Sequence, residues 1–259
     1  MAHHFFLPGA VNPAQPVVLE GEIAHHAIRV LRLRAGETIT LADNRGQGYL
    51  AEIIAIQKGQ VVAGIKAPLA SPEPRVKVAL YQGWPKGDKI DFIIEKGTEL
   101  GVARVIILTT ERSIPRPDPG AAERRRQRWQ QKALAAARQS RRHVVPDVGG
   151  PLDLAVALAG LQPGTLLLVP WEEERSRSLK SIFAGAAGDP SADTLPGTGS
   201  LIREIALLIG PEGGWSQAEI DLIRERGGLP VTLGPRILRT ETAGLACLAA
   251  IMYALGELG

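Results

Sequence analysis

The feature that most constrains this 259-residue chain is a regular alternation of strand-like and helix-like segments over most of its length. Apolar runs such as VKVALYQG, RVIILTT and IREIALLIG alternate with amphipathic segments such as DKIDFIIEKGTELG and SQAEIDLIRERGG. Nearly continuous apolar runs are typical of strands that are buried on both faces of a parallel sheet. The alternation therefore predicts an α/β domain whose mostly parallel sheet has helices on both faces.

The N-terminal part follows a different pattern. Residues 17–66 contain short strand-like runs such as ETITLAD and QVVAGIK, separated by turns that contain glycine, with one helical piece at His25–Leu33. This pattern predicts a small β-barrel. The segment Ala67–Pro74 contains three prolines and reads as a linker. We therefore expect two domains: a β-barrel over residues 1–70 and an α/β domain over residues 75–259.

Composition excludes several classes of protein. The single cysteine, Cys247, rules out a disulfide framework and a Cys-rich zinc site, and we expect it to be a small core residue. The histidines lack the spacing of a metal-binding helix, so we predict no metal. The start of the chain does not read as a signal peptide, and the longest apolar run, Ala243–Gly256, is shorter than the ~20 residues of a membrane span. We expect a soluble, cytoplasmic protein, with a flexible surface loop at Gly185–Ser200.

Basic residues are concentrated in one stretch. Residues 104–142 contain 11 basic and 3 acidic residues, a local net charge of +8, although the whole chain carries only +3. Of its 30 cationic side chains 22 are arginine, which binds phosphate bidentately and stacks on bases. A one-sided basic run favours a polyanionic partner over a merely solvated helix face.

Two patterns resemble nucleotide-binding motifs but fail on context. Gly46-Gln-Gly48-Tyr-Leu-Ala51 has the G-x-G-x-x-A spacing of dinucleotide-binding turns, yet a strand-like run follows it where that motif requires a helix. The segment Pro85–Lys89 resembles a phosphate-binding loop but lacks its glycine spacing and its Ser or Thr. We interpret the first as a hairpin turn and assign no nucleotide site to either.

The most specific local pattern is IALLIGPEGGWSQAEIDLI. The strand-like run Ile205–Ile209 ends in Gly210-Pro211-Glu212-Gly213-Gly214, and Ser216 and Glu219 then have the S-x-x-E spacing of a helix capping box. Glycines beside a helix start let a ligand approach free backbone N–H groups, and open α/β sheets bind ligands at the carboxyl ends of their strands. A merely tight connection would need one glycine. The pattern therefore favours a ligand-binding loop.

A second loop follows the strand predicted at Val231–Leu233. It reads Gly234-Pro-Arg236-Ile-Leu-Arg239-Thr-Glu241-Thr242 and leads into the apolar C-terminal helix. Two arginines and a glutamate in an otherwise apolar segment are costly if they are buried alone. These side chains must be paired, exposed or functional.

The segments IGPEGGWSQAEI and LGPRILRTETA resemble the two characteristic segments of the RsmE family, methyltransferases of the SPOUT superfamily. The resemblance extends over nearly the whole chain, because HAIRVLRLRAGETITLAD is similar to the family's PUA-like barrel and QGWPKGDKIDFIIEKGTELGV to its central part. It implies methylation of N3 of a uridine in small-subunit (16S) ribosomal RNA.

The resemblance also implies a fold, a cofactor and a partner. The C-terminal domain is expected to be a SPOUT fold with a deep trefoil knot in about residues 165–259, and the protein to be a homodimer through the knotted region and the final helix. S-adenosylmethionine is expected to bind there, held by backbone groups of three loops. The expected cofactor-binding residues are Val169, Pro170, Ile209, Gly210, Pro211, Glu212, Gly213, Gly214, Leu233, Gly234, Ile237, Leu238, Thr240 and Thr242.

The implied reaction assigns roles to two charged residues. Uracil N3 is a weakly acidic imide, so it must lose its proton before it attacks a sulfonium methyl group, which requires a base or a stabilising cation. We expect Arg239 to stabilise the anion. Glu241 is either the base or a group that orients Arg239, and charge complementarity at a helix N-terminus remains an alternative for it. No cysteine is placed for the covalent route to C5 methylation.

Two other functions remain possible for a chain with these features. A methyltransferase that acts on another ribosomal or transfer RNA nucleotide is one alternative, and a non-catalytic RNA-binding or ribosome-assembly factor is the other. The expected phosphate contacts are Arg29, Arg32, Arg112, Arg124, Arg128 and Arg142.

Overall fold

The computed structural model describes residues 2–115, 119–184 and 204–258, and the loop predicted at Gly185–Ser200 lies outside them. Contacts divide the chain into two compact units. The N-terminal unit comprises Met1–Glu73 and Ala137–Val145, and the C-terminal unit comprises Pro74–Ala136 and Pro146–Gly259. The first boundary lies at the proline-rich segment, but the sequence did not indicate that residues 137–145 belong with the N-terminal unit.

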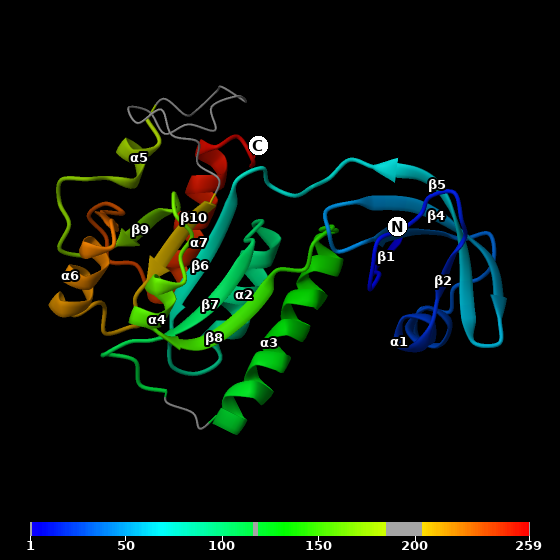
Figure 1. Cartoon of the computed structure of the whole chain (residues 1–259), viewed down its shortest axis with the longest axis horizontal. Helices are drawn as coiled ribbons and strands as arrows, with labels where there is room; N and C mark the ends of the chain where they lie inside the picture. The colour runs from blue at the N-terminus through cyan, green and yellow to red at the C-terminus, as the bar shows by residue number, and fades with distance from the viewer. Residues whose placement is uncertain (1, 116–118, 185–203, 259) are drawn as a thin grey trace. The chain divides into compact units, whose positions relative to one another are not determined.

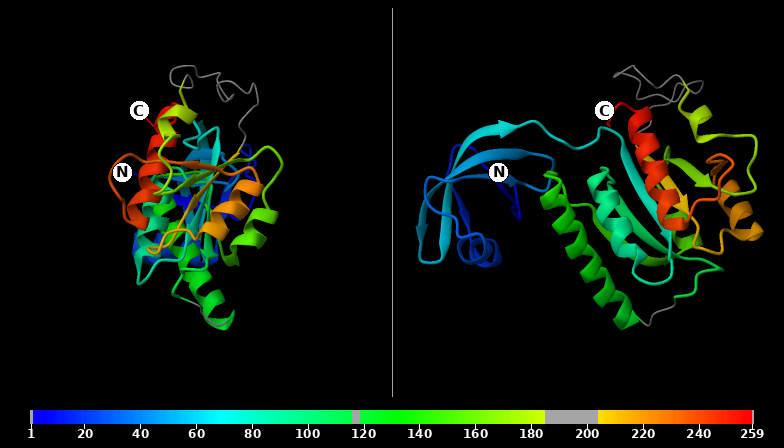
Figure 2. Two further views of the ribbon diagram at one scale, coloured as in Figure 1. Left: turned by 90° about the vertical axis from the view of Figure 1, so that its left-hand side faces the viewer. Right: turned by 180° about the vertical axis from the view of Figure 1, so that it is seen from behind.

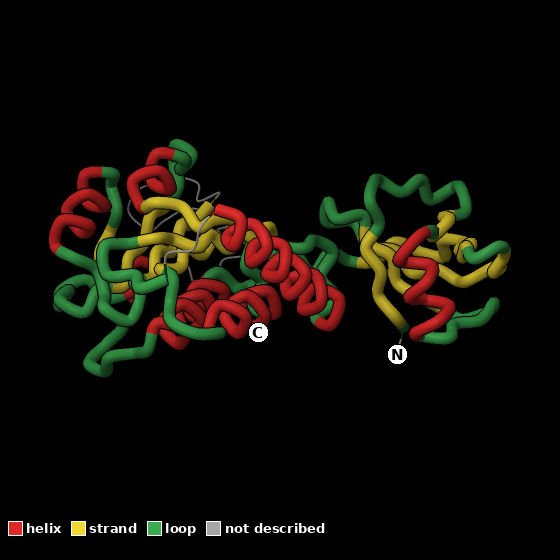
Figure 3. The backbone as a smooth tube through the Cα atoms, turned by 90° about the horizontal axis from the view of Figure 1, so that it is seen from below, coloured by secondary structure: helices red, strands yellow, loops and turns green. Residues whose placement is uncertain are grey.

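A five-stranded sheet in the order β1-β3-β4-β5-β2 forms the N-terminal unit. Its β1 is parallel to β3 and the other pairs are antiparallel; β1 and β2 are edges, so strand pairing does not close the predicted barrel within the described residues. A short helix that continues as one π-helical turn lies beside the strands (Figure 3) and adds Ala24 and Ala27 to the core. The elements are β1 (His3–Phe6), β2 (Val17–Leu19), α1 (Gly21–His25), η1 (His26–Val30), β3 (Thr38–Ala42), β4 (Gly48–Gln57) and β5 (Gln60–Leu69).

Residues 137–145 are anchored in the N-terminal unit by the largely buried carboxylate of Glu73. Glu73 forms an ion pair with Arg142, whose side chain is only 6% exposed. The Glu73 Oε1 atom also accepts hydrogen bonds from the backbone N–H groups of His143 (2.7 Å) and Val144 (3.1 Å). The backbone carbonyl of Arg142 in turn accepts a hydrogen bond from the imidazole Nε2 of His4 at 2.8 Å. Arg142 is thus a buried structural residue, and the prediction that it contacts phosphate is wrong.

The C-terminal unit contains a six-stranded sheet in the order β11-β9-β10-β6-β7-β8, and every neighbouring pair is parallel (Figure 1). This confirms the parallel α/β sheet predicted from the alternation. The strand after α6 ends at Val231, two residues before the predicted end. The strands are β6 (Lys77–Gly83), β7 (Arg104–Thr109), β8 (Asp147–Asp153), β9 (Leu166–Pro170), β10 (Glu204–Ile209) and β11 (Leu229–Val231).

Helices cover both faces of this sheet (Figure 2). On one face, α4 and α6 bury Leu154, Ala157, Ile220 and Ile223 against alternate residues of β6 and β10. On the other face, α2 and α7 lie side by side, and Gly244 lets α7 approach Leu80 closely. The helices are α2 (Lys89–Glu99), α3 (Pro119–Gln139), α4 (Leu154–Ala159), α5 (Leu179–Ile182), α6 (Gln217–Glu225) and α7 (Thr240–Ala254).

Among the described residues, no helix has both the length and the apolar character needed to cross a membrane. The same residues contain no group of three or more His, Cys, Asp or Glu arranged to hold a metal ion. Cys247 is buried in α7, as expected for a core residue, and burial raises the pKa of its thiol to about 12.

Candidate functional site

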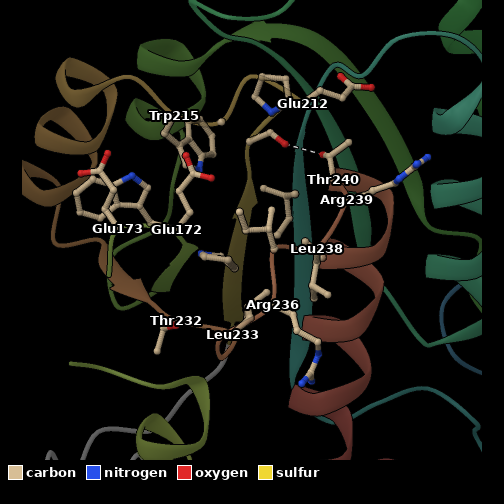
Figure 4. A pocket seen from close by; sticks show the side chains of 18 of the residues that line it. Glu172, Glu173, Glu212, Trp215, Thr232, Leu233, Arg236, Leu238, Arg239 and Thr240 are labelled. Atoms are coloured by element: carbon tan, nitrogen blue, oxygen red, sulfur yellow. Dashed lines mark hydrogen bonds between the residues drawn. The ribbon is translucent and has the colours of Figure 1, made fainter. Parts of the chain in front are cut away.

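A cavity of about 750 Å³ lies in the C-terminal unit where β9, β10 and β11 end. Three loops line it, one after each of these strands, and Figure 4 shows side chains from all three around the same space. This is the edge at which open α/β sheets bind ligands, and the volume suits a cofactor-sized molecule. Of the predicted cofactor residues, those that line the cavity are Pro170, Ile209, Gly210, Pro211, Glu212, Gly213, Gly214, Leu233, Gly234, Ile237, Leu238 and Thr240.

Two predicted cofactor residues do not line this cavity. Val169 is completely buried in β9, and Thr242 is exposed on the first turn of α7. Of the two predicted catalytic residues, Arg239 lines the cavity and Glu241 does not. The cavity therefore gathers most of the residues that the sequence singled out, from segments about 70 residues apart.

The first loop, after β9, is shaped by a carboxylate within it. Glu174 accepts hydrogen bonds at one oxygen from the Ser176 hydroxyl (2.6 Å) and from the backbone N–H groups of Ser176 (2.7 Å) and Arg177 (3.0 Å). These bonds favour the ionised form and lower the pKa of Glu174 to about 2, with the Ser176 hydroxyl as the main cause. The loop so folded presents Glu172 and Glu173 to the cavity (Figure 4).

The shape of the second loop, Gly210–Gly214, requires glycine at one position within it and at one position beside it. Gly214 has φ +69°, a conformation that other residues adopt only with strain. Gly83, at the end of β6, lies so close to the loop that a Cβ atom would stand 2.6 Å from the backbone nitrogen of Pro211. The loop is therefore packed directly on the end of the neighbouring strand.

A capping box then begins α6, as predicted. The backbone N–H of Ser216 donates to Glu219 Oε2 (2.9 Å), and the N–H of Glu219 donates to Ser216 Oγ (3.3 Å). The other oxygen of Glu219 accepts from the N–H of Glu111 (2.8 Å), and Arg112 donates to the carbonyl of Gly213 (2.8 Å). The loop after β7 is thus attached to the second loop.

The third segment is tied to the second loop by a buried hydroxyl. Thr240 Oγ1 donates to the carbonyl oxygen of Gly210 (2.6 Å) and accepts from the side-chain amide of Gln82 (2.8 Å). Thr240 is 6% exposed and Gln82 is fully buried, so water does not replace the bond between these two side chains. The start of α7 is therefore held against the loop after β10.

The charged groups of the third segment have different surroundings. Glu241 forms an ion pair with Lys89 at 3.2 Å, and the same ammonium contacts Glu212 at 2.8 Å. Hydrogen bonding to Glu212, and secondarily to Glu241, raises the pKa of Lys89 above its usual value. Arg236 and Arg239 are exposed, and Figure 4 shows Arg239 on the opposite side from Glu172 and Glu173. Glu241 thus contacts Lys89, whereas orientation of Arg239 by Glu241 stays a prediction.

The predicted phosphate contacts, apart from Arg142, are exposed. Arg29 and Arg32 belong to the N-terminal unit, and Arg112, Arg124 and Arg128 to the C-terminal unit. Two are engaged within the chain: Arg112 with Gly213, as above, and Arg128 with Asp91 at 2.9 Å. Contact of these five with RNA stays a prediction.

Several residues that line the cavity were not among the predicted site residues, including Lys89, Glu172, Glu173, Trp215 and Arg236. Arg236 had been singled out as a charged residue of the second predicted loop, and Glu172 lies in the loop after Val169 that the family resemblance also implies. Lys89 follows β6, outside the three loops, and no local pattern connects it with them. The indole N–H of Trp215 is buried without a hydrogen-bond partner at the cavity wall.

Comparison with known proteins identifies the class of protein to which the chain belongs. A family model described as an RNA methyltransferase domain matches residues 71–252, and one described as an RNA methyltransferase PUA domain matches residues 19–66. Ribosomal RNA small subunit methyltransferase E of Bacillus subtilis is 34% identical over 94% of this chain and 92% of its own length. The Mycobacterium tuberculosis protein of the same name is 29% identical over 95% and 90%. The chain belongs to the ribosomal RNA small subunit methyltransferase E family, the RsmE family.

Solved structures agree with this assignment. Ribosomal RNA small subunit methyltransferase E from Neisseria gonorrhoeae, bound to S-adenosylmethionine, is 33% identical, covers 97% of each chain and superposes with a TM-score of 0.81. A protein from Legionella pneumophila in complex with the same cofactor is 29% identical over 98% of each chain, with a TM-score of 0.79.

Proposed function

We propose that this protein transfers a methyl group from S-adenosylmethionine to N3 of a specific uridine in small-subunit ribosomal RNA. The observation that carries the proposal is the cavity formed by three loops at the carboxyl edge of the parallel sheet, in a chain of this family. Relatives are named for methylation of small-subunit ribosomal RNA, and two similar structures hold S-adenosylmethionine.

The residues present fit this cofactor. The buried, unpartnered indole N–H of Trp215 at the cavity wall offers a donor for a polar group of a ligand. Glycines at 210, 213 and 214 keep the backbone of the second loop accessible, while Ile209, Leu233 and Leu238 supply apolar walls. The cofactor supplies an electrophilic methyl group on a sulfonium.

Arg239 provides the cation that the chemistry requires. A uridine imide that loses its N3 proton becomes an anion, and Arg239, an exposed arginine in the lining of the cavity, stabilises that charge. One such donor is worth ~10²–10³ in rate. Glu241 forms an ion pair with Lys89. It acts either as the base that removes the N3 proton or through its negative charge, which stabilises the N-terminus of α7.

The proposed function also implies a particular domain architecture and a homodimer. We place a SPOUT fold with a deep trefoil knot in about residues 165–259, a PUA-like RNA-binding domain in residues 1–70 and the methyltransferase domain in residues 75–259. We also propose a homodimer formed through α7, where Tyr253 is 72% exposed on an apolar helix. The reaction belongs in the cytoplasm, where ribosomal subunits are.

Methyl transfer to defined RNA substrates tests the proposal. Purified protein and radiolabelled S-adenosylmethionine are incubated with assembled small subunits, naked 16S RNA or transfer RNA, and mass mapping locates the product. Calorimetry with S-adenosylhomocysteine tests the pocket separately. Binding without transfer to any RNA would support the non-catalytic assembly factor, and transfer to a different nucleotide would support the other alternative.

Substitution of Arg239 tests the chemical step. Arg239→Ala should lower the rate of methyl transfer at least about 100-fold, because the anion loses its cation, while binding of S-adenosylhomocysteine is retained. Arg226→Ala, an exposed arginine at the end of α6 outside the cavity, is the matched control and should leave the rate unchanged. Unchanged turnover of Arg239→Ala would contradict the assigned role.

A further inference from the structure

Lys89 lies where the second loop and the start of α7 meet. Its ammonium contacts Glu212 Oε1 of the second loop at 2.8 Å and Glu241 Oε2 of α7 at 3.2 Å, and the side chain is 30% exposed. The two carboxylates belong to the two segments to which the proposed function assigns cofactor binding and catalysis. We propose that Lys89 is a positioning residue that holds the cofactor loop and the catalytic segment in register through these two ion pairs.

The position of Lys89 is itself well defined. It is the first residue of α2, on the segment Pro85–Lys89 for which the sequence suggested no role. The backbone N–H of Lys86, in the loop before α2, donates to Glu212 Oε1 at 3.1 Å, so the same carboxylate is bound by this loop and by the Lys89 side chain. Glu212 is therefore drawn towards α2 by two donors, and this fixes the direction of the second loop.

Glu241 meets the Lys89 ammonium through its Oε2 atom. The contact is 3.2 Å long, and the Glu241 side chain is 17% exposed. Burial of a carboxylate is costly, so the ammonium of Lys89 compensates its charge. The raised pKa of Lys89 keeps this ammonium protonated over the pH range of an enzyme assay.

Removal of the ammonium would leave two like charges close together. The two carboxylate oxygens cannot be farther apart than the two contacts to Lys89 laid end to end. Their repulsion would push the second loop away from α7 and work against the Thr240–Gly210 hydrogen bond, which connects the same two segments. Both cofactor affinity and the rate at saturating cofactor should then fall.

The inference rests on the proposed function, and Lys89→Met in the full-length protein tests it. We expect a dissociation constant for S-adenosylhomocysteine about tenfold higher, and a kcat at saturating S-adenosylmethionine about tenfold lower. Lys89→Arg, which keeps the charge, should recover most of both. Lys96→Met is the matched control, because Lys96 lies on the same helix and contacts two carboxylates, Glu95 and Glu99, away from the cavity; both parameters should stay within twofold of wild type.

The double variant Lys89→Met/Glu212→Gln separates positioning from direct contact with substrate. It removes the repulsion between the carboxylates, so kcat should rise above that of Lys89→Met alone. A double variant no better than the single one, or Lys89→Arg no better than Lys89→Met, would overturn the inference, as would wild-type values for Lys89→Met. A wild-type protein that binds S-adenosylhomocysteine but methylates no RNA would refute the proposed function alone, and the binding arm would still test Lys89.

Discussion

The hydroxyl of Thr240 offers the sharpest test of how the site is held together. Thr240→Val keeps the shape and the β-branched character of the side chain but removes its donor and its acceptor. The carbonyl of Gly210 then loses its 2.6 Å hydrogen bond, and the amide of Gln82 loses its 2.8 Å hydrogen bond. Thr240→Ser, which keeps the hydroxyl, is the matched control.

The structure sets the size of the effect. Each hydrogen bond is worth about 1 kcal/mol net, so their loss removes about 2 kcal/mol. Gly210 lines the cavity, where water reaches its carbonyl, but Gln82 is fully buried, and an unpaired N–H there costs about 1 kcal/mol more. We therefore expect the free energy of unfolding to fall by about 2–3 kcal/mol. For a chain of this length that corresponds to a decrease in Tm of about 5–10 °C.

Two measurements check this prediction. Chemical denaturation of wild type, Thr240→Val and Thr240→Ser gives the change in stability, and calorimetry with S-adenosylhomocysteine shows whether the loosened loop binds more weakly. Thr240→Ser should retain most of the stability that Thr240→Val loses. The reasoning is refuted if Thr240→Val lies within 0.5 kcal/mol of wild type, given the ~2 kcal/mol expected, or if Thr240→Ser loses as much as Thr240→Val.

Three further predictions follow from the N-terminal unit and the charged surface. Arg142→Met should destabilise the protein by about 3 kcal/mol, because the largely buried carboxylate of Glu73 keeps its two backbone donors but loses its counter-charge; the double variant Arg142→Met/Glu73→Gln should be less destabilised, and equal losses would contradict this explanation. Burial lowers the pKa of His4 from 6.5 to about 4, so the unfolded chain binds a proton between these values and the folded chain does not. The corresponding stability is present above pH 6.5 and lost as pH falls towards 4, by about 1–2 kcal/mol after allowance for partial exposure; urea titrations of wild type and His4→Gln should converge as pH falls over this range, and parallel curves would refute the assignment. If the five exposed candidate arginines neutralise phosphates, the logarithm of RNA affinity should fall with log salt at a slope of about −3.5 to −4.5, and a flat dependence would exclude them.

Much of the C-terminal fold could be predicted because its signals are local. The capping box at Ser216 and Glu219 involves a backbone and two side chains within four residues, and both of its hydrogen bonds form. The parallel sheet followed from apolar runs that alternate with amphipathic helices. Such patterns are reliable because they depend only on the periodicity of the backbone and on hydrogen bonds to N–H groups a few residues away.

Elements that depend on distant partners were missed. The strand β8, Asp147–Asp153, contains two glycines and a proline and has no strand-like pattern, yet it pairs with β7 from Arg104 to Thr109. The short β1 forms only because β3 lies beside it. In both cases the pairing partner, and not intrinsic propensity, determines the strand.

The sequence by itself determined the α/β class and the glycine-rich loop with its capping box, because glycine patterns, caps and hydrophobic periods act between near neighbours. Most of the predicted residues that line the cavity came from the resemblance to the RsmE family. The tertiary structure decided which charges are paired and which are exposed. It buried Arg142 against Glu73 and placed Lys89 between Glu212 and Glu241, partners 123 and 152 residues away in the chain. Coulomb attraction and desolvation depend on distance and burial in space, and neither is encoded in the spacing of residues along the chain.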